Sequence, residues 1–270
     1  MGYGPALGGV TTLTFIQMSK RIKVPGRNLR LSSSKSSIKV SRRQSTIEQL
    51  TEIDIAIPIA SKRDQSPIQA KTPNQRKYIE AIQNSPLTFS TGPSGVGKTF
   101  IAAALAAQYL EEKKVQKIIL TRPAVEAGES LGFLPGELEE KFDPYLWPFR
   151  DVLEQRLGKT YFEYLLKSGA IETRPLAYMR GMTLKDAFVI LDEAQNASPV
   201  QMQMFLTRIG KNSVVVVNGD LKQKDISGTS GLEDALRKVM CIPEVSWVEF
   251  GTEDIVRSDL VGKIVKAYNR

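Results

Sequence analysis

The chain has 270 residues and a formal net charge of +8, which is enough length for one buried core with a small annex. A single cysteine, Cys241, and the lack of histidine exclude a disulfide framework, a Cys/His zinc site and catalysis by an imidazole base. No run approaches the roughly 18 to 20 apolar residues of a membrane span. We therefore expect a protein of the reducing cytoplasm that makes no membrane contact.

Residues 1–71 form the first distinct region of the chain. They carry 12 Lys and Arg against 4 Asp and Glu, so the whole net charge lies here, and they are rich in serine. Such a composition buries too little apolar surface to offset chain entropy. We expect a basic, largely disordered extension, which either attracts nucleic-acid phosphates or is simply a solvated tail.

From residue 72 to residue 270, short apolar runs alternate with helical patterns, as in a single α/β domain with a mostly parallel sheet of five or more strands. The expected strands are 87–91, 116–121, 187–191, 213–218 and 245–249. The expected helices are 97–112, 138–157, 159–168, 199–209, 231–239 and 259–268. Residues 214–217 are continuously apolar, which is typical of a central strand covered on both faces.

The segment between the first expected strand and the first expected helix reads Gly92-Pro93-Ser94-Gly95-Val96-Gly97-Lys98-Thr99. In this context it is a phosphate loop. Its glycines let backbone N–H groups point at phosphates, Lys98 reaches the β- and γ-phosphates, and the hydroxyl of Thr99 binds Mg²⁺. We predict that all eight residues bind ATP.

Two adjacent carboxylates, Asp192 and Glu193, follow the strand 187–191. Asp192 is expected to hold Mg²⁺ through the water shell of the metal, and Glu193 to polarise the attacking water. This pair favours hydrolysis over transfer of the phosphoryl group to an acceptor.

A third polar group follows the strand 213–218, at a sharp turn. Ligands of open α/β sheets bind at the carboxyl edge of the strands. We therefore expect Asn218, Asp220 and Gln223 to lie near the γ-phosphate or the lytic water.

Together, the phosphate loop, Asp192-Glu193-Ala194-Gln195 and Gly219-Asp220-x-x-Gln223 resemble motifs I, II and III of superfamily 1 helicases. Five more segments look like those of the PhoH-like ATPase family, in that family's order: Thr121-Arg122-Pro123-Ala124-Val125, Leu131-Gly132-Phe133-Leu134-Pro135-Gly136, Asp143-Pro144-Tyr145, Tyr178-Met179-Arg180-Gly181 and Asp254-Ile255-Val256-Arg257. The resemblance extends from about residue 71 to residue 270. It implies a RecA-like P-loop NTPase core, ATP hydrolysis and a role in RNA metabolism. The chain departs from many relatives at Met182, where they have a second arginine, and at Ser258, where they often have histidine.

Several further residues receive a role from this resemblance or from their position. Gln75 matches a glutamine that contacts the adenine edge in superfamily 1 helicases, whereas the alternative is a helix start capped by Thr72 or Asn74. Arg122 either contacts a nucleic-acid backbone or is ion-paired to Glu126, Glu129 or Glu137.

The arginine that stabilises the transition state is expected to come from a neighbouring subunit, because one RecA-like core forms half of such a site. Arg257 is the first candidate, in competition with Arg150, Arg174 and Arg180, each of which could instead form a surface ion pair. The aromatic segment 142–149 either stacks on bases or packs within the protein.

We therefore expect a helicase-like ATPase that needs ATP and Mg²⁺ and forms a homo-oligomer, a hexameric ring, on single-stranded RNA, with DNA as the alternative. Its catalytic residues would be Lys98, Glu193, Gln223 and Arg257. The two rival functions are a kinase for a small acceptor, which Glu193 disfavours because it invites wasteful hydrolysis, and an ATP-dependent switch that never translocates.

Overall fold

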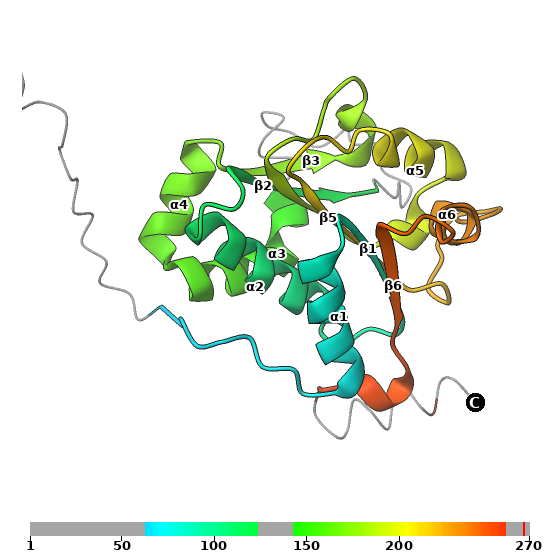
Figure 1. Ribbon diagram of the computed structural model, residues 1–270, viewed down its shortest axis with the longest axis horizontal. Coiled ribbons are helices and arrows are strands. Elements are labelled where there is room, and N and C mark those ends of the chain that lie inside the picture. The colour runs from blue at the N-terminus through cyan, green and yellow to red at the C-terminus, as the bar shows by residue number, and fades with distance from the viewer. Residues whose placement is uncertain (1–62, 124–142, 258–266, 268–270) are drawn as a thin grey trace, which may run out of the picture. The chain divides into compact units, whose positions relative to one another are not determined.

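The computed structural model describes residues 63–123, 143–257 and 267, all within one compact unit of the chain. In these residues six strands form one sheet in the order β3-β2-β4-β5-β1-β6, with every neighbouring pair parallel (Figure 1). The strands are β1 Leu87–Thr91, β2 Lys117–Arg122, β3 Ile171–Pro175, β4 Ala187–Leu191, β5 Val214–Gly219 and β6 Val245–Glu249. The helices are α1 Pro73–Asn84, α2 Lys98–Glu111, α3 Asp143–Leu157, α4 Lys159–Lys167, α5 Pro199–Leu206 and α6 Gly231–Val239.

The five expected strands are confirmed to within one residue at each end, and five of the expected helices are confirmed within the described residues. The expected helix at 259–268 and the extension at 1–62 lie outside these residues, residue 267 excepted. Strand β3 was not predicted, and α1 was considered only as the alternative of a helix start capped by Thr72 or Asn74. One strand, β5, separates the strand that leads into the phosphate loop from the strand that leads into Asp192, which is the arrangement of a RecA-like P-loop core.

Helices cover both faces of the sheet (Figure 1). Helices α1 to α4 pack on one face, in a cluster that includes Val216, and α5 and α6 pack on the other, in a cluster that includes Val215 and Val217. Successive residues of a strand point to opposite faces, so β5 is buried on both sides. The continuous apolar run therefore does mark a central strand.

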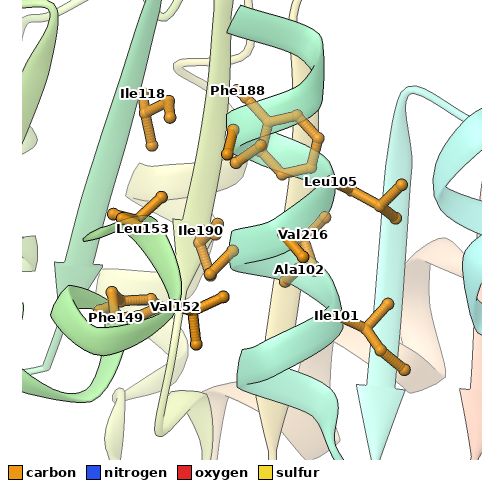
Figure 2. Packing of buried hydrophobic residues seen from close by; sticks show 14 of the residues in the cluster. Ile101, Ala102, Leu105, Ile118, Phe149, Val152, Leu153, Phe188, Ile190 and Val216 are labelled. Atoms are coloured by element: carbon orange, nitrogen blue, oxygen red, sulfur yellow. The ribbon is translucent and has the colours of Figure 1, made fainter. Parts of the chain in front are cut away.

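Helix α2 holds the phosphate loop by packing tightly on the sheet. Figure 2 shows Ala102 of α2 beside Val216 of β5, and Ile101 and Leu105 of the same helix belong to the same buried cluster as Phe188 of β4. These side chains are almost fully buried, and burial of each large one contributes about 1.5 to 3 kcal/mol. The small alanines of α2 let the helix approach the sheet closely, so the start of the helix is fixed relative to the strand ends.

Residues 63–71 contain no helix or strand but lie along the domain. Arg63 forms an ion pair of 3.2 Å with Glu111 of α2, and the N–H of Asp64 donates to the carbonyl of Gln155 in α3. Thr72 is the N-cap of α1, and the expected domain start at residue 72 stays a prediction. Within the described ranges, no helix is long and apolar enough to cross a membrane.

Candidate nucleotide-binding site

The predicted phosphate loop connects β1 to α2. Gly92, Gly95 and Gly97 have φ values of 139°, 88° and 92°, which side chains with a Cβ rarely adopt. A Cβ at Gly92 would also collide with the carbonyl oxygen of Phe250. The loop therefore needs glycine at these positions, and it ends at the N-terminus of a 14-residue helix, where backbone N–H groups favour an anion.

Gln75 supports the loop from α1. Its Nε2 donates to the carbonyl of Val96 at 2.8 Å, and its Oε1 accepts from the N–H of Lys71 at 2.7 Å. The backbone N–H of Gln75 donates to Thr72 Oγ1, so the capping by Thr72 that we considered is present. The side chain is 3% exposed and lies against the loop, while its contact with adenine stays a prediction.

Residues 254–257 also contact the phosphate loop. The N–H of Val256 donates to the carbonyl of Gly95 at 3.1 Å, and the side chain of Arg257 lies against Gly95, with its Cδ only 3.0 Å from where a Cβ would be. Asp254 anchors this segment by accepting from Asn74 Nδ2 at 2.8 Å. Sequence reasoning identified Arg257 but not the way this segment covers its own loop.

Lys98 turns back onto the loop. Its Nζ donates to the carbonyls of Gly92 at 2.6 Å and Pro93 at 3.0 Å. Burial lowers the pKa of Lys98, and the nearby charges of Asp220, Asp192 and Glu193 oppose this shift without cancelling it. The side chain is thus held at the loop in a position from which it can exchange carbonyl oxygens for phosphate oxygens.

Thr99 and Asp192 come together as predicted, although they lie on different elements. Thr99 Oγ1 is 3.3 Å from both carboxylate oxygens of Asp192. Within the described ranges, no cluster of three or more acidic or cysteine side chains could hold a metal. A hydroxyl and one carboxylate are nevertheless the hard oxygen donors that suit Mg²⁺, which takes few protein ligands when it also binds phosphates and water.

Arg122 is ion-paired to a carboxylate that the sequence did not suggest, while its expected pairing with Glu126, Glu129 or Glu137 stays a prediction. Its Nη2 lies 2.6 Å from Asp192 Oδ2, whereas Glu126, Glu129 and Glu137 lie outside the described residues. The pairing arises because β2 and β4 are neighbours in the sheet, which the sequence does not reveal.

Glu193 has a left-handed backbone with φ of 54°, and its side chain is 49% exposed. Gln195 Nε2 donates to Glu193 Oε2 at 2.7 Å and to the carbonyl of Gln223 at 3.2 Å, and Gln195 Oε1 accepts from the N–H of Asp220 at 3.0 Å. Gln195 therefore connects the predicted base to the turn after β5. Sequence analysis identified Gln195 only as the last residue of the motif Asp192-Glu193-Ala194-Gln195 and gave it no role.

Asn218 differs from its prediction. It is fully buried, and its Oδ1 accepts from the hydroxyls of Tyr78 at 2.6 Å and Ser90 at 2.8 Å. Burial raises the pKa of Tyr78, so its hydroxyl keeps the proton it donates here. Asn218 thus supports the strand ends beneath the loop, whereas Asp220 and Gln223 line the cavity above.

The three other candidate arginines and part of the aromatic segment lie in the described residues, and Arg180 is exposed. Arg150 pairs with Glu154 and Arg174 with Glu172, and both pairs lie within this chain. In the aromatic segment, Phe149 is buried in the core whereas Trp147 is 69% exposed.

These groups surround a cavity of about 470 Å³ beside the loop. It is lined by the following site residues: Ser94, Gly95, Gly97, Lys98, Thr99, Arg122, Asp192, Glu193, Gln223 and Arg257. A second cavity of about 610 Å³ shares Ser94, Asp220 and Gln223 with the first. The structure therefore brings together the loop, the carboxylate pair and the turn after β5, with both cavities in the size range of small-molecule sites.

Comparison with known proteins agrees with this arrangement of motifs. The model of the family described as PhoH-like protein matches residues 67–269. The chain is 51% identical over 205 residues to a PhoH-like protein of Bacillus subtilis, covering 75% of this chain and 64% of that one, and 50% identical over 211 residues to Protein PhoH of Escherichia coli, covering 77% and 60%. Among solved structures, the Pif1 helicase of Candida albicans matches with a TM-score of 0.37 and 11% identity, covering 69% of this chain and 40% of that one. The chain spans less than two thirds of the length of the PhoH relatives named above. The family model matches three quarters of the chain, and about half of the aligned residues are identical to those of these relatives. The chain therefore belongs to the PhoH-like protein family.

Proposed function

We propose that this protein is an ATPase that hydrolyses ATP with the help of Mg²⁺. The observation that carries the proposal is the convergence of three strand ends on one cavity: the phosphate loop after β1, the pair Asp192 and Glu193 after β4, and the turn after β5. A nucleotide-binding loop alone would suit a kinase or a switch equally well. Glu193 beside the loop supports hydrolysis, because it offers a base for water where the γ-phosphate would lie.

Each residue has a defined task in this proposal. Lys98 exchanges its bonds with the loop carbonyls for the β- and γ-phosphates, and the N-terminus of α2 holds the phosphates through its N–H groups. Thr99 and Asp192 hold the metal, which neutralises charge on the phosphates when bound. Glu193, oriented by Gln195, accepts a proton from the attacking water. Gln223, joined to Gln195 through its carbonyl, responds to the γ-phosphate.

The position of Arg257 supports a role in its own chain. We expected a neighbouring subunit to supply this positive charge, but the side chain lies against Gly95 of its own loop. It can therefore reach the phosphates from within the same subunit, provided that the segment 254–257 keeps this place when nucleotide is bound.

We further propose that the protein works as a homo-oligomer, a hexameric ring, on single-stranded RNA, with single-stranded DNA as the alternative substrate. Two large apolar side chains near the cavity support a subunit contact: Phe100, which lines it, is 48% exposed, and Trp147, next to the lining residue Pro148, is 69% exposed.

The exposed free thiol of Cys241 suits a cytoplasmic site of action, where it would stay reduced.

The test measures phosphate release by the purified protein, with and without single-stranded RNA or DNA, over a series of protein concentrations. Turnover that RNA stimulates and that rises steeply with concentration supports the oligomeric enzyme. Phosphate release that depends neither on nucleic acid nor on protein concentration would support an ATPase but would contradict the RNA-directed, oligomeric motor. ADP formed only with an added acceptor, without free phosphate, would show a kinase, and nucleotide binding without any turnover would show a switch.

Two variants connect this activity to the site. Glu193→Gln should keep binding of a fluorescent ATP analogue and lose hydrolysis by about 10²-fold or more, whereas Lys98→Ala should weaken both. Glu244→Gln is the matched control, since Glu244 is exposed and lies away from both cavities. Unchanged turnover in Glu193→Gln would overturn the assignment of the base.

A further inference from the structure

Arg122 is the last residue of β2, and its guanidinium lies inside the candidate site. Strands β2 and β4 run in parallel with Thr121 opposite Leu191, which brings Arg122 beside Asp192. Arg122 Nη2 is 2.6 Å from Asp192 Oδ2 and 3.9 Å from Glu193 Oε1. The side chains of Arg122 and Asp192 are only 20% and 5% exposed, so water screens this pair far less than it screens a surface ion pair.

Packing holds the guanidinium in this place. It lies over the ring of Phe149, 5.8 Å from the ring centroid, in a geometry that favours arginine over lysine. Its Nε is buried and has no hydrogen-bond partner in the described part of the chain. Among the described residues, the contact with Asp192 is therefore the main compensation for burying this charge.

Lys98, another cation of the site, does not make this contact. Lys98 Nζ donates to two carbonyls of its own loop, whereas Arg122 bonds directly to Asp192. Asp192 is also the carboxylate that faces Thr99 at 3.3 Å. A hydrated Mg²⁺ bound between Thr99 and Asp192 would thus need the same carboxylate that the guanidinium now occupies.

We propose that Arg122 is a positioning residue that competes with the metal for Asp192. It neutralises and orients the carboxylate while the site holds no metal, and it gives up this contact when the metal–nucleotide complex enters. The inference rests on the proposed function, because it assumes that Asp192 belongs to a metal–nucleotide site. Its consequence is specific: removing the charge of Arg122 tightens metal binding, whereas loss of an ordinary structural contact would weaken it.

The experiment titrates Mn²⁺ into the full-length protein bound to a non-hydrolysable ATP analogue and follows the free metal by electron paramagnetic resonance. The analogue is kept below the protein concentration so that it is fully bound. Arg122→Gln keeps a donor for Asp192 but removes the positive charge, and the Mn²⁺ dissociation constant should fall about tenfold, the size expected when the metal no longer has to displace a charge-assisted hydrogen bond. Arg122→Lys keeps the charge and loses the contact with Phe149, so the expected fall is about threefold.

Two controls sharpen the result. Arg237→Gln makes the same chemical change on exposed α6 and should leave Mn²⁺ affinity unchanged. In an Asp192→Asn background, Arg122→Gln should change the affinity by less than about twofold, because the shared carboxylate is gone.

An unchanged or weaker Mn²⁺ affinity in Arg122→Gln would overturn the inference, as would an equal gain in both backgrounds, which would point to general charge repulsion without competition for Asp192. If the glutamine variant does not fold, the lysine variant tests whether loosening the contact with Asp192 tightens Mn²⁺ binding, and an unchanged affinity there would also overturn the inference. A wild-type protein that binds no Mn²⁺–analogue complex would instead overturn the proposed function, so the two failures can be told apart.

Discussion

Gln195 is the side chain that joins the ends of β4 and β5, and its removal gives a sharp test of the site. Its amide makes three hydrogen bonds, to Glu193 Oε2, to the carbonyl of Gln223 and from the N–H of Asp220. The residue is 1% exposed. Water can replace the donor to Glu193, whose side chain is 49% exposed, but the N–H of Asp220 belongs to a buried residue and would lose its partner.

The magnitude follows from these bonds. Each contributes about 0.5 to 1.5 kcal/mol, and a buried donor left without a partner, here the N–H of Asp220, costs about 1 to 3 kcal/mol. We expect Gln195→Ala to lower the free energy of unfolding by about 2 to 4 kcal/mol. Urea denaturation of the nucleotide-free protein, followed by tryptophan fluorescence, measures this quantity without reference to any activity.

The matched control is Gln203→Ala on α5, where the glutamine is exposed and the same substitution should stay within about 0.5 kcal/mol. A loss in Gln195→Ala no larger than that of the control would refute the connecting role of Gln195. Phosphate release should also fall, because the carboxylate of Glu193 loses the donor that orients it. If Gln195→Ala loses the expected stability but keeps the turnover of the wild type, Gln195 has a structural role and does not orient Glu193 for catalysis.

Three further results are expected. Gly95→Ala should weaken binding of a fluorescent ATP analogue by tenfold or more, because φ is +88° and the new Cβ would press on Arg257; unchanged binding would count against the described loop. Burial raises the pKa of Glu172, but hydrogen bonds and ion pairs with its basic neighbours on β2 and β3 outweigh burial and lower the pKa below 4.5. The stabilising effect of the Glu172 carboxylate is therefore present above pH 4.5 and is lost as the pH falls through the lowered pKa. The stability difference between the wild type and Glu172→Gln in urea should therefore shrink in acid, and a constant difference would contradict the shift. Tyr78→Phe should lower the free energy of unfolding by about 1 kcal/mol by removing the donor to Asn218, and a neutral effect in the same titration would show that this bond contributes nothing.

Two elements, β3 and α1, were not predicted in full from the sequence. Strand β3 lies at the edge of the sheet, and between Ile171 and Pro175 its residues are polar and partly exposed, so it lacks the apolar run that marked the other strands. Helix α1 buries little more than Gln75, Tyr78 and Ile82, and the sequence indicated it only through the possible cap at its start. Both elements are held by neighbours that only the folded chain supplies.

Among the site residues, too, some features were predictable from the sequence and others depended on the folded chain. The loop at 92–99 and its position between a strand and a helix were predictable, because the chemistry lies in adjacent residues. The pairing of Arg122 with Asp192 was not, since it depends on β2 and β4 being neighbours although about 70 residues separate the two side chains. The burial of Asn218 beneath the loop was likewise hidden, because its partners come from α1 and β1.

The amino-acid sequence by itself determined the phosphate loop, the carboxylate pair and the identity of five strands, because glycine geometry, adjacent acids and continuous apolar runs are local properties. Only the tertiary structure decided which side chains meet across those strands. The order of the sheet places the guanidinium of Arg122 on the carboxylate of Asp192, the amide of Gln195 between Glu193 and the turn after β5, and Arg257 against its own loop. These contacts depend on how distant strands pair, and pairing is set by the packing of the whole core.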